Sequence, residues 1–541
     1  MLAGVALAMV LLAGCGPGGP LSTRLRETVV RPEPGVVLFL CDGFQPDLLE
    51  QGCREGWLPN IQKRFVEGGM RVENAVTIIP PITYAAIASI VTGALPPDHR
   101  ITGNRWFDPE ERLFRDYVTI RYYRAVNEDF AVPTLYERLD PAASTSIQAA
   151  HMRGVTDNIA NWAESGVRWF FGIYTGVDKL TATTVERVAG RANARGLWPT
   201  ALMCYFPGLD SVGHAHGVSS PEYRRAAEHM DHQVGRVCDW LDREGLLETT
   251  YMVLVADHGM LDVSEFVDLL ALLRDGWGRE ATDAIVQDGS FEQRCRFYDR
   301  FDSVVAHQDG RKASLYFAGT GGWDTVPEPA VVEHVLTNPP VEQQLWSLPG
   351  VDLVMYLTGE NEACLRSARG TARITMRDRA DGPEYRYEPM TADVLGYTED
   401  ADLAAFVAAG FHHAPAWLAA TASAEFPNLV PQVVPLLHEP RAGQVIVCAA
   451  PGYSFTREAG GHGGVRRAEV RVPLLFAGPG IEPGSVIPYA QTVDIVPTVL
   501  ALLGTDAPRD RYLAGVPRLD GAWARAVRAR TPEEEMSSGG K

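Results

Sequence analysis

The stretch VVLFLCDG at residues 36–43 decides the fold class of this chain. Its first six residues are apolar without interruption, which is typical of a strand buried on both faces of a parallel sheet. Asp42 and Gly43 follow directly, so a carboxylate stands where the strand ends and the backbone can turn sharply. Open α/β sheets bind ligands at the carboxyl ends of their strands. The stretch therefore predicts an α/β protein with functional side chains at that sheet edge.

The rest of the chain alternates between strand and helix patterns. Further strands are predicted at 145–151, 198–206, 250–256, 444–449 and 472–477. Helical periodicity is found at 58–67, 84–94, 182–195, 221–245 and 492–503. This alternation indicates a sheet covered by helices on both faces. Between about 263 and 440 the pattern loosens into charged helices and a predicted hairpin at 375–389, which we interpret as an insertion or cap beside the site.

Side chains suited to metal binding gather in short blocks, several of them at predicted strand ends. The blocks are CDG (41–43), PPIT (80–83), DSVGHAHG (210–217), ADHGM (256–260) and GGHG (460–463). They supply six potential ligands, namely Asp42, Asp210, His214, Asp257, His258 and His462, and one hydroxyl, Thr83. Six ligands suit two three-ligand zinc sites that each keep a position open for substrate or water. This inventory predicts a phosphoryl-transfer hydrolase.

Each block also has a simpler explanation or a rival. Asp42 and Thr83 could be helix N-caps, and a histidine in a glycine loop is most often without function. Asp210 and His214 are four residues apart and can face one ion, whereas His216 would point elsewhere. The rivals for the other roles are His412 and His413 in place of His462, and Thr77, Ser89 and Thr92 in place of Thr83.

Composition limits the class of partner. The net charge of −19 over 541 residues leaves no excess of Lys and Arg to neutralise a nucleic-acid duplex, so none is expected as a partner. A small phosphate ester held by metal ions remains compatible, because local cations override the global field. Nothing in the sequence indicates the oligomeric state.

The two ends of the chain differ from its centre. Residues 1–14 contain an apolar run of signal-peptide length, and Leu12-Ala13-Gly14-Cys15 resembles a bacterial lipobox, in which Cys15 would be lipidated. Residues 15–35 then form a tether, and residues 518–541 a charged, disordered tail. We therefore expect an exported protein that is lipid-anchored to a bacterial membrane on its periplasmic or outer side. A buried N-terminal helix is the alternative.

Longer segments show a resemblance to a known family. PPITYAAIASIVTGALPPDHRITGNRWFD (80–108), PRAGQVIVCAAPGYSF (440–455) and GGHGG (460–464), with the blocks above, resemble the type I phosphodiesterase/nucleotide pyrophosphatase family of the alkaline phosphatase superfamily. The resemblance covers most of 36–300 and 435–505. It implies an alkaline phosphatase-like three-layer sandwich at 36–517, with a mostly parallel central sheet, helices on both faces and a cap at about 263–440.

The resemblance also implies the roles of individual residues. Thr83 becomes the nucleophile, with its oxygen on a metal ion, and Asn104 of the Gly-Asn pair grips the phosphate. One Zn²⁺ is held by Asp42, Asp257 and His258, and a second Zn²⁺ by Asp210, His214 and His462. The chain departs from the family at Tyr84-Ala85-Ala86, where the family often has Pro-Asn, so the surface near the leaving group is open to question.

These inferences predict hydrolysis of phosphate diesters or nucleotide pyrophosphates through a phospho-threonine. Tyr84 could stack on the base of a nucleotide substrate. The first alternative is a phosphomonoesterase in which His151 and Arg153 bind extra phosphate oxygens, although Arg153 alone is more typical of a surface salt bridge. A sulfatase is disfavoured because its Cys/Ser-x-Pro-x-Arg signature is absent around residue 83. A non-catalytic binding lipoprotein is the weakest alternative, since all six ligands are intact.

Overall fold

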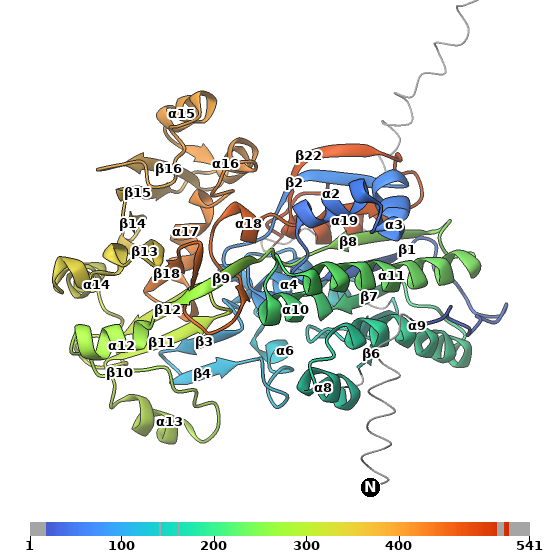
Figure 1. Ribbon diagram of the computed structural model, residues 1–541, viewed down its shortest axis with the longest axis horizontal. Coiled ribbons are helices and arrows are strands. Elements are labelled where there is room, and N and C mark those ends of the chain that lie inside the picture. Colours follow the sequence, from blue (N-terminus) through green and yellow to red (C-terminus); the bar gives the residue numbers. More distant parts are fainter. Residues whose placement is uncertain (1–17, 140–141, 161, 506–512, 519–541) are drawn as a thin grey trace, which may run out of the picture.

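The computed structural model describes residues 18–139, 142–160, 162–505 and 513–518, and an eight-stranded sheet forms the centre of one of its two halves, on the right in Figure 1. Its strands, in spatial order, are β22 (Ser485–Gln491), β2 (Met70–Val76), β21 (Leu474–Ala477), β8 (Thr250–Val255), β1 (Gly35–Cys41), β7 (Ala201–Phe206), β5 (Ser144–Ile147) and β6 (Asp157–Ile159).

The predicted strand at 36–41 lies in the middle of this sheet. β1 is buried along its whole length and pairs in parallel with β7 on one side and β8 on the other. The pairs β5–β7, β5–β6 and β2–β22 are also parallel, whereas β21 runs antiparallel to both neighbours. The carboxyl ends of β1, β7 and β8 therefore meet at one edge, where the polar blocks follow.

Helices pack on the sheet in two groups. In one group α11 (Pro221–Arg243) packs against α3 (Pro59–Ile61), α9 (Thr175–Arg195) and α10 (Gly208–His216). In the other α4 (Thr83–Thr92) packs against α5 (Pro96–His99), α7 (Leu135–Arg138) and α19 (Ile495–Leu502). The remaining helices of this half are α2 (Pro46–Glu55), η1 (Gln62–Glu67), α6 (Val126–Asp129), α8 (Trp162–Phe170), α18 (Arg467–Val470) and η6 (Thr492–Asp494). The predicted three-layer, mostly parallel α/β class is confirmed.

A nine-stranded sheet builds a second body beside the first. Its order is β10 (Ala281–Thr282), β11 (Ser303–Gln308), β12 (Lys312–Phe317), β18 (Val445–Ala449), β13 (Val351–Gly359), β14 (Glu362–Ser367), β15 (Gly370–Arg377), β16 (Glu384–Pro389) and β17 (His412–His413). Its helices are α12 (Leu269–Ala271), η2 (Leu272–Gly276), α13 (Phe291–Tyr298), α14 (Pro329–Thr337), η3 (Val341–Gln343), η4 (Leu345–Ser347), α15 (Ala401–Ala408), α16 (Ala414–Thr421), α17 (Val430–His438) and η5 (Pro440–Ala442). Apart from β10–β11, its strand pairs are antiparallel.

Two small sheets join these bodies. β9 (Leu261–Phe266) lies between β19 (Gly452–Ser454) and β20 (Gly460–Gly461), and β3 (Arg105–Asp108) pairs with β4 (Leu113–Asp116). β20 pairs Gly460 with Asp262 and Gly461 with Leu261. This pairing brings the GGHG block next to the ADHGM block, although about 200 residues separate them along the chain.

The second body differs from its sequence-based description. The stretch expected to hold charged helices contains the strands β10–β17 as well as the helices α12–α17, and the hairpin predicted at 375–389 is present as β15 and β16. The strand predicted at 444–449 belongs to this second sheet as β18, not to the central one. Cys41, Cys204 and Cys448 are buried free thiols, as expected of small core residues. The predicted signal peptide, Cys15 and most of the predicted tail lie outside the described residues.

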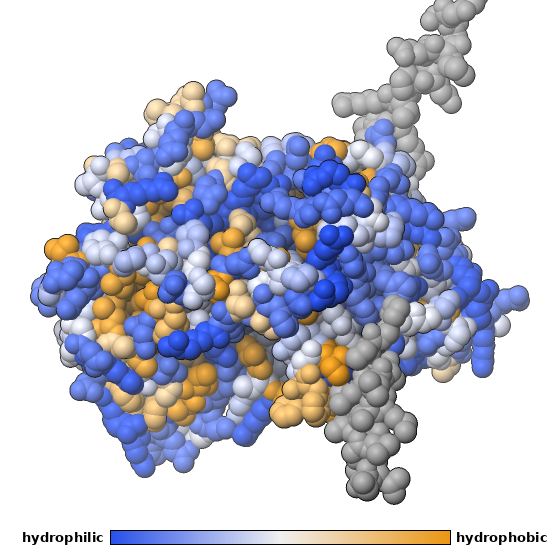
Figure 2. Space-filling view, viewed as in Figure 1, coloured by the Kyte–Doolittle hydropathy of each residue, from blue (hydrophilic) through white to orange (hydrophobic). Residues whose placement is uncertain are grey.

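The face of the molecule in Figure 2 is mostly hydrophilic, and apolar side chains on this face gather mainly over the half that carries the nine-stranded sheet. Among the described residues, no helix combines the length and apolar character needed to cross a bilayer.

Lys312, the first residue of β12, is a fully buried amine. Its Nζ donates to Ser314 Oγ at 2.7 Å, and its side chain has no solvent exposure. Burial lowers the pKa of the ammonium group to about 7. In the unfolded chain a lysine titrates near pH ~10.4. Between these values the unfolded state binds more protons than the folded state, so stability must rise with pH.

We therefore expect the free energy of unfolding to rise from pH 7 to pH 10 relative to a Lys312→Met variant. The slope difference is at most about 1.4 kcal/mol per pH unit, the value for one proton. Denaturant unfolding of both proteins across this range, at a fixed zinc concentration, measures it. Parallel pH profiles for the two proteins would contradict the buried-amine explanation.

Candidate active site

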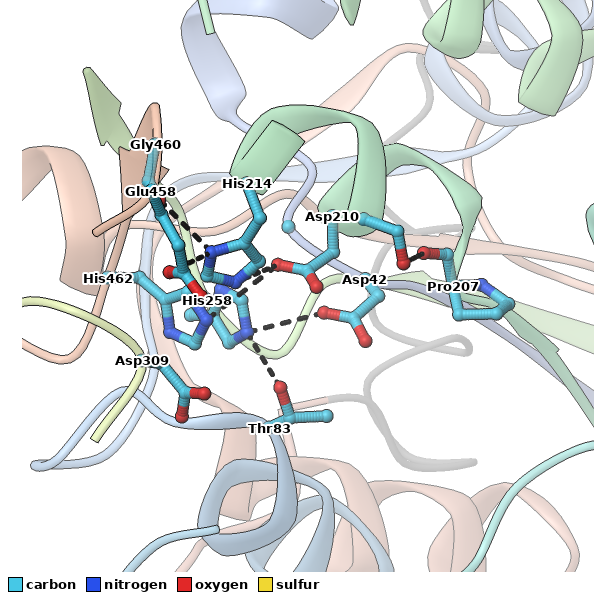
Figure 3. A network of polar contacts seen from close by, with 12 residues as sticks. Asp42, Thr83, Pro207, Asp210, His214, His258, Asp309, Glu458, Gly460 and His462 are labelled. Carbon is cyan, nitrogen blue, oxygen red and sulfur yellow. Dashed lines mark hydrogen bonds and ion pairs between the residues drawn. The ribbon is translucent and has the colours of Figure 1, made fainter. Parts of the chain in front are cut away.

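Asp42, Asp257 and His258 form one cluster at the edge where β1 and β8 end. Figure 3 shows Asp42 and His258 of this cluster. His258 Nε2 lies 3.2 Å from Asp42 Oδ1 and 3.4 Å from Asp257 Oδ2. All three side chains are almost completely buried. Gly43 turns the chain after Asp42 with a φ of 68°, and a Cβ there would lie 3.0 Å from Asp210. Glycine thus allows the first cluster to approach the second.

Asp210, His214 and His462 form the second cluster. Asp210 and His214 come from successive turns of α10, which follows β7, and His462 follows β20. Asp210 Oδ1 lies 3.4 Å from His214 Nε2 and 3.7 Å from His462 Nε2. The imidazoles of His258 and His462 stack with centroids 3.5 Å apart, so the two clusters are adjacent. Within each cluster the potential ligand atoms lie within 4.8 Å of one another.

The unpaired atoms of the two clusters fit bound cations. Asp42 Oδ1, Asp257 Oδ2, Asp210 Oδ1 and His462 Nε2 are buried atoms without a hydrogen-bond partner. A buried polar atom rarely lacks a hydrogen-bond partner in the protein unless an ion or a water molecule binds it. Nitrogen and carboxylate oxygen are also the donor set that zinc accepts.

Every histidine of the two clusters is oriented by a bond from its other ring nitrogen. Nδ1 of His258 lies 3.0 Å from Gly259 O, and Nδ1 of His462 lies 3.0 Å from Pro81 O. His214 Nδ1 lies 2.8 Å from Glu458 Oε2 and 3.0 Å from Gly460 O. Such partners fix the tautomer and the ring angle of metal-binding histidines, leaving Nε2 as the ligand atom.

The buried carboxylates of the two clusters also require positive charge nearby. Burial and the charge of Asp42 raise the pKa of Asp257, and they raise that of Asp210 to about 7. Burial lowers the pKa of His258 and His214, but nearby carboxylates outweigh it and raise both values to about 10. Bound protons thus offset the negative charge of the buried carboxylates, and divalent cations can replace these protons.

Thr83 is the first residue of α4, and its Oγ1 lies 3.1 Å from His258 Nε2. The hydroxyl therefore faces the first cluster (Figure 3). The backbone N–H groups of the first helical turn have no acceptor within the helix and favour an anion. The N-cap residue is Ile82, so the hydroxyl of Thr83 is not the cap of this helix.

Asn104 lies beside this helix terminus. Its Oδ1 accepts from Tyr84 N at 2.9 Å, and its Nδ2 donates to Asp309 Oδ2 at 2.7 Å. These two bonds determine which end of the amide is nitrogen and leave the second hydrogen of Nδ2 for another acceptor. The predicted phosphate-binding amide is therefore next to the predicted nucleophile.

A family model for type I phosphodiesterase / nucleotide pyrophosphatase matches residues 36–317, more than half of the chain. The chain belongs to this family. The family identification made from the sequence is thereby confirmed.

Curated relatives share part of the chain. An uncharacterized pyrophosphatase/phosphodiesterase of Schizosaccharomyces pombe is 24% identical over 235 residues, which are 42% of this chain and 45% of that protein. Rat ectonucleotide pyrophosphatase/phosphodiesterase family member 1 is 29% identical over 252 residues, 43% of this chain and 26% of that protein. The chain thus matches less than half of the length of these relatives.

Solved structures share the fold over most of the chain. Murine ectonucleotide pyrophosphatase/phosphodiesterase 5 is 14% identical, with a TM-score of 0.53, and the match covers 88% of this chain and 97% of that chain. An inactive threonine-to-alanine form of the same murine protein, in complex with AMP, gives a TM-score of 0.51 at 14% identity, covering 89% of this chain and 97% of that chain.

The three predicted substrate-binding residues are engaged with other parts of the protein. Tyr84 stacks on Tyr117 with centroids 4.8 Å apart, and its hydroxyl donates to Tyr117 O. His151 is buried, with Nε2 2.9 Å from Tyr84 O. Arg153 binds the carboxylate of Glu137 and the carbonyls of Phe130 and Val132. His412 and His413 lie on β17 of the second sheet, outside both clusters.

Sequence reasoning missed several residues around the clusters. Tyr205 donates its hydroxyl to Asp42 Oδ2, Glu458 orients His214, and Asp309 binds Asn104. Asp309 and Glu458 lie outside helices and strands, where no periodicity marks them. Tyr205 had a usable signal, because it is the next-to-last residue of the predicted strand and so lies close to the predicted ligand edge.

Proposed function

We propose that this chain is a zinc-dependent hydrolase of phosphate diesters or nucleotide pyrophosphates that works through a phospho-threonine at Thr83. One observation carries the proposal. Two adjacent three-ligand clusters face a threonine hydroxyl at a helix N-terminus, and four of their ligand atoms are buried without a partner. Asp42, Asp257 and His258 would hold one zinc ion, and Asp210, His214 and His462 the other.

Bound zinc ions supply Lewis-acid chemistry, lowering the pKa of hydroxyl groups and water and offsetting phosphoryl charge. Thr83 Oγ attacks the phosphorus and loses its proton to solvent, and the bond to the leaving oxygen breaks. Asn104 Nδ2 and the backbone N–H of Thr83 donate to a non-bridging oxygen, a contribution of about 3 kcal/mol. Water then attacks phospho-Thr83, releases the phosphate monoester and restores the hydroxyl.

Nucleotides are the substrate class that the comparisons favour. The murine relative of similar fold binds AMP in its inactive form, and the family description includes nucleotide pyrophosphatases. The phosphomonoesterase alternative gains no support, because His151 and Arg153 already bind protein groups. A protein that only binds its ligand would not need the hydroxyl of Thr83 beside two complete sets of metal-binding side chains.

Metal analysis and chelation test the proposal. We expect two zinc ions per chain and loss of bis-p-nitrophenyl phosphate hydrolysis after chelation, restored by added zinc, because the clusters require cations to hold substrate. Thermal unfolding should also shift to lower temperature on chelation, since ligands that bind only the folded state stabilise it. One metal ion per chain or none, or faster turnover of p-nitrophenyl phosphate than of the diester, would overturn the proposal.

Attachment to a membrane is part of this proposal. The lipobox-like Leu12-Ala13-Gly14-Cys15 and the apolar run before it support export and lipidation at Cys15. The active site would then face the periplasm or the medium, where small phosphate esters can reach it.

A further inference from the structure

Asp309 places a carboxylate beside the phosphate-binding amide. It lies between β11 and β12, with Oδ2 accepting from Asn104 Nδ2 at 2.7 Å. Figure 3 shows the Asp309 side chain on the same side of His462 as Thr83. A carboxylate is an unexpected neighbour for a site that is to receive an anion, and neither Thr83 nor the two clusters require it.

The backbone holds Asp309 rigidly at this place. Its φ is 40°, in the left-handed region, and its carbonyl accepts from His462 N at 2.9 Å. Arg311 N returns a bond to His462 O at 3.1 Å, so the turn at Asp309 is tied to the second cluster from both sides. A movement of this loop backbone would therefore also disturb His462.

The geometry points to Asp309 as a specificity-determining residue that orients the amide of Asn104 and selects phosphate diesters over monoesters. This inference rests on the proposed function. A phosphate oxygen that accepts the second hydrogen of Asn104 Nδ2 lies within roughly 5 Å of the Asp309 carboxylate. Burial raises the pKa of the Asp309 carboxyl, and the nearby charges of His214 and Arg105 oppose this rise. Zinc ions held by the two clusters would oppose it further and favour the ionised carboxylate. A monoester dianion then meets more repulsion than a diester monoanion, because the Coulomb energy scales with charge.

The substitution Asp309→Asn removes the negative charge of the side chain and keeps its size and shape. Asparagine tolerates a positive φ and can still accept from Asn104, so only the charge is lost. With zinc-loaded protein we expect kcat/KM for p-nitrophenyl phosphate to rise by about tenfold or more relative to bis-p-nitrophenyl phosphate. Glu292→Gln removes one charge from an 82% exposed side chain of α13 and should leave this ratio unchanged.

A binding measurement makes the test independent of turnover. Calorimetry on zinc-loaded protein compares inorganic phosphate, a dianion at pH 8, with dimethyl phosphate, a monoanion. Asp309→Asn should tighten phosphate binding by about tenfold while changing dimethyl phosphate little. If the wild-type protein hydrolyses neither ester, the proposed function is wrong. The affinities for inorganic phosphate and dimethyl phosphate still test whether Asp309 selects between the two charges.

Asp309→Ala tests the orienting role. Without the carboxylate, Asn104 keeps its bond from Tyr84 N but loses the acceptor that orients Nδ2, so kcat for the diester should fall several-fold in Asp309→Ala but not in Asp309→Asn. If Asp309→Asn changes neither the ratio of monoester to diester kcat/KM nor the ratio of the two affinities, then the charge of Asp309 does not select the substrate. Wild-type diester turnover in Asp309→Ala would overturn the orienting role.

Discussion

Replacing Thr83 by alanine is expected to lower kcat/KM for diester hydrolysis by at least about a thousandfold. The hydroxyl is the nucleophile in the proposed reaction, and its Oγ1 faces His258 Nε2 at 3.1 Å. Water could attack the substrate directly in its place, but without the fixed position at the start of α4. Steady-state kinetics on bis-p-nitrophenyl phosphate measure the loss, and metal analysis should still find two zinc ions per chain.

Thr92 provides the matched control. It lies on the same helix, where its hydroxyl donates to Ala88 O at 2.7 Å, and it is one of the three rival nucleophiles in the sequence. Thr92→Ala should cost some stability but retain diester turnover. Thr83→Ser should retain part of it, and a phosphorylated peptide containing Thr83 should be found only when residue 83 carries a hydroxyl. More than a tenth of wild-type activity in metal-loaded Thr83→Ala would refute the mechanism.

Replacing Glu469 by alanine is expected to lower the free energy of unfolding by about 3–5 kcal/mol, the usual cost of leaving a buried charge unpaired. Glu469 Oε1 accepts from Arg311 Nε at 2.8 Å, and both side chains have no solvent exposure. Arg311 also donates to three backbone carbonyls, those of Ala449, Ala450 and Tyr453. Its charge would remain buried without a counter-ion.

Glu469 is also bonded to the two loops that carry His258 and His462. Its Oε1 accepts from Gly464 N and its carbonyl from Gly259 N, each at 2.8 Å. Denaturant unfolding at fixed zinc concentration measures the change. The control is Glu292→Ala, which breaks an ion pair with Arg296 whose partners are 76% and 82% exposed and should cost less than about 0.5 kcal/mol. Equal effects of the two substitutions would show that the buried pair adds no stability.

The sequence predicted the central sheet because its signals are local. A fully apolar run at 36–41 can only be buried on both faces, and the strands after which Asp210 and Asp257 follow carry the same signal. The second sheet was not predicted, since periodicity does not say which sheet a strand joins. β18 shows this, because its apolar run at 445–449 suits either sheet.

The predicted substrate-binding residues show the same limit. Arg153 follows a strand, as phosphate-binding residues often do, but Thr134 and Glu137 form a capping box that places a carboxylate beside it. The capping box could be read from Thr134 and Glu137, but its contact with Arg153 could not, because 16 residues separate Glu137 from Arg153.

The sequence by itself determined the α/β class, the family and the inventory of Asp42, Thr83, Asp210, His214, Asp257, His258 and His462. Residue types and the ends of apolar runs carry that information locally. Only the tertiary structure decided that the β9–β20 pairing brings His462 to His258, and that a turn at Asp309 places a carboxylate on Asn104. Contacts between segments hundreds of residues apart depend on how two sheets dock, and no local pattern encodes that docking.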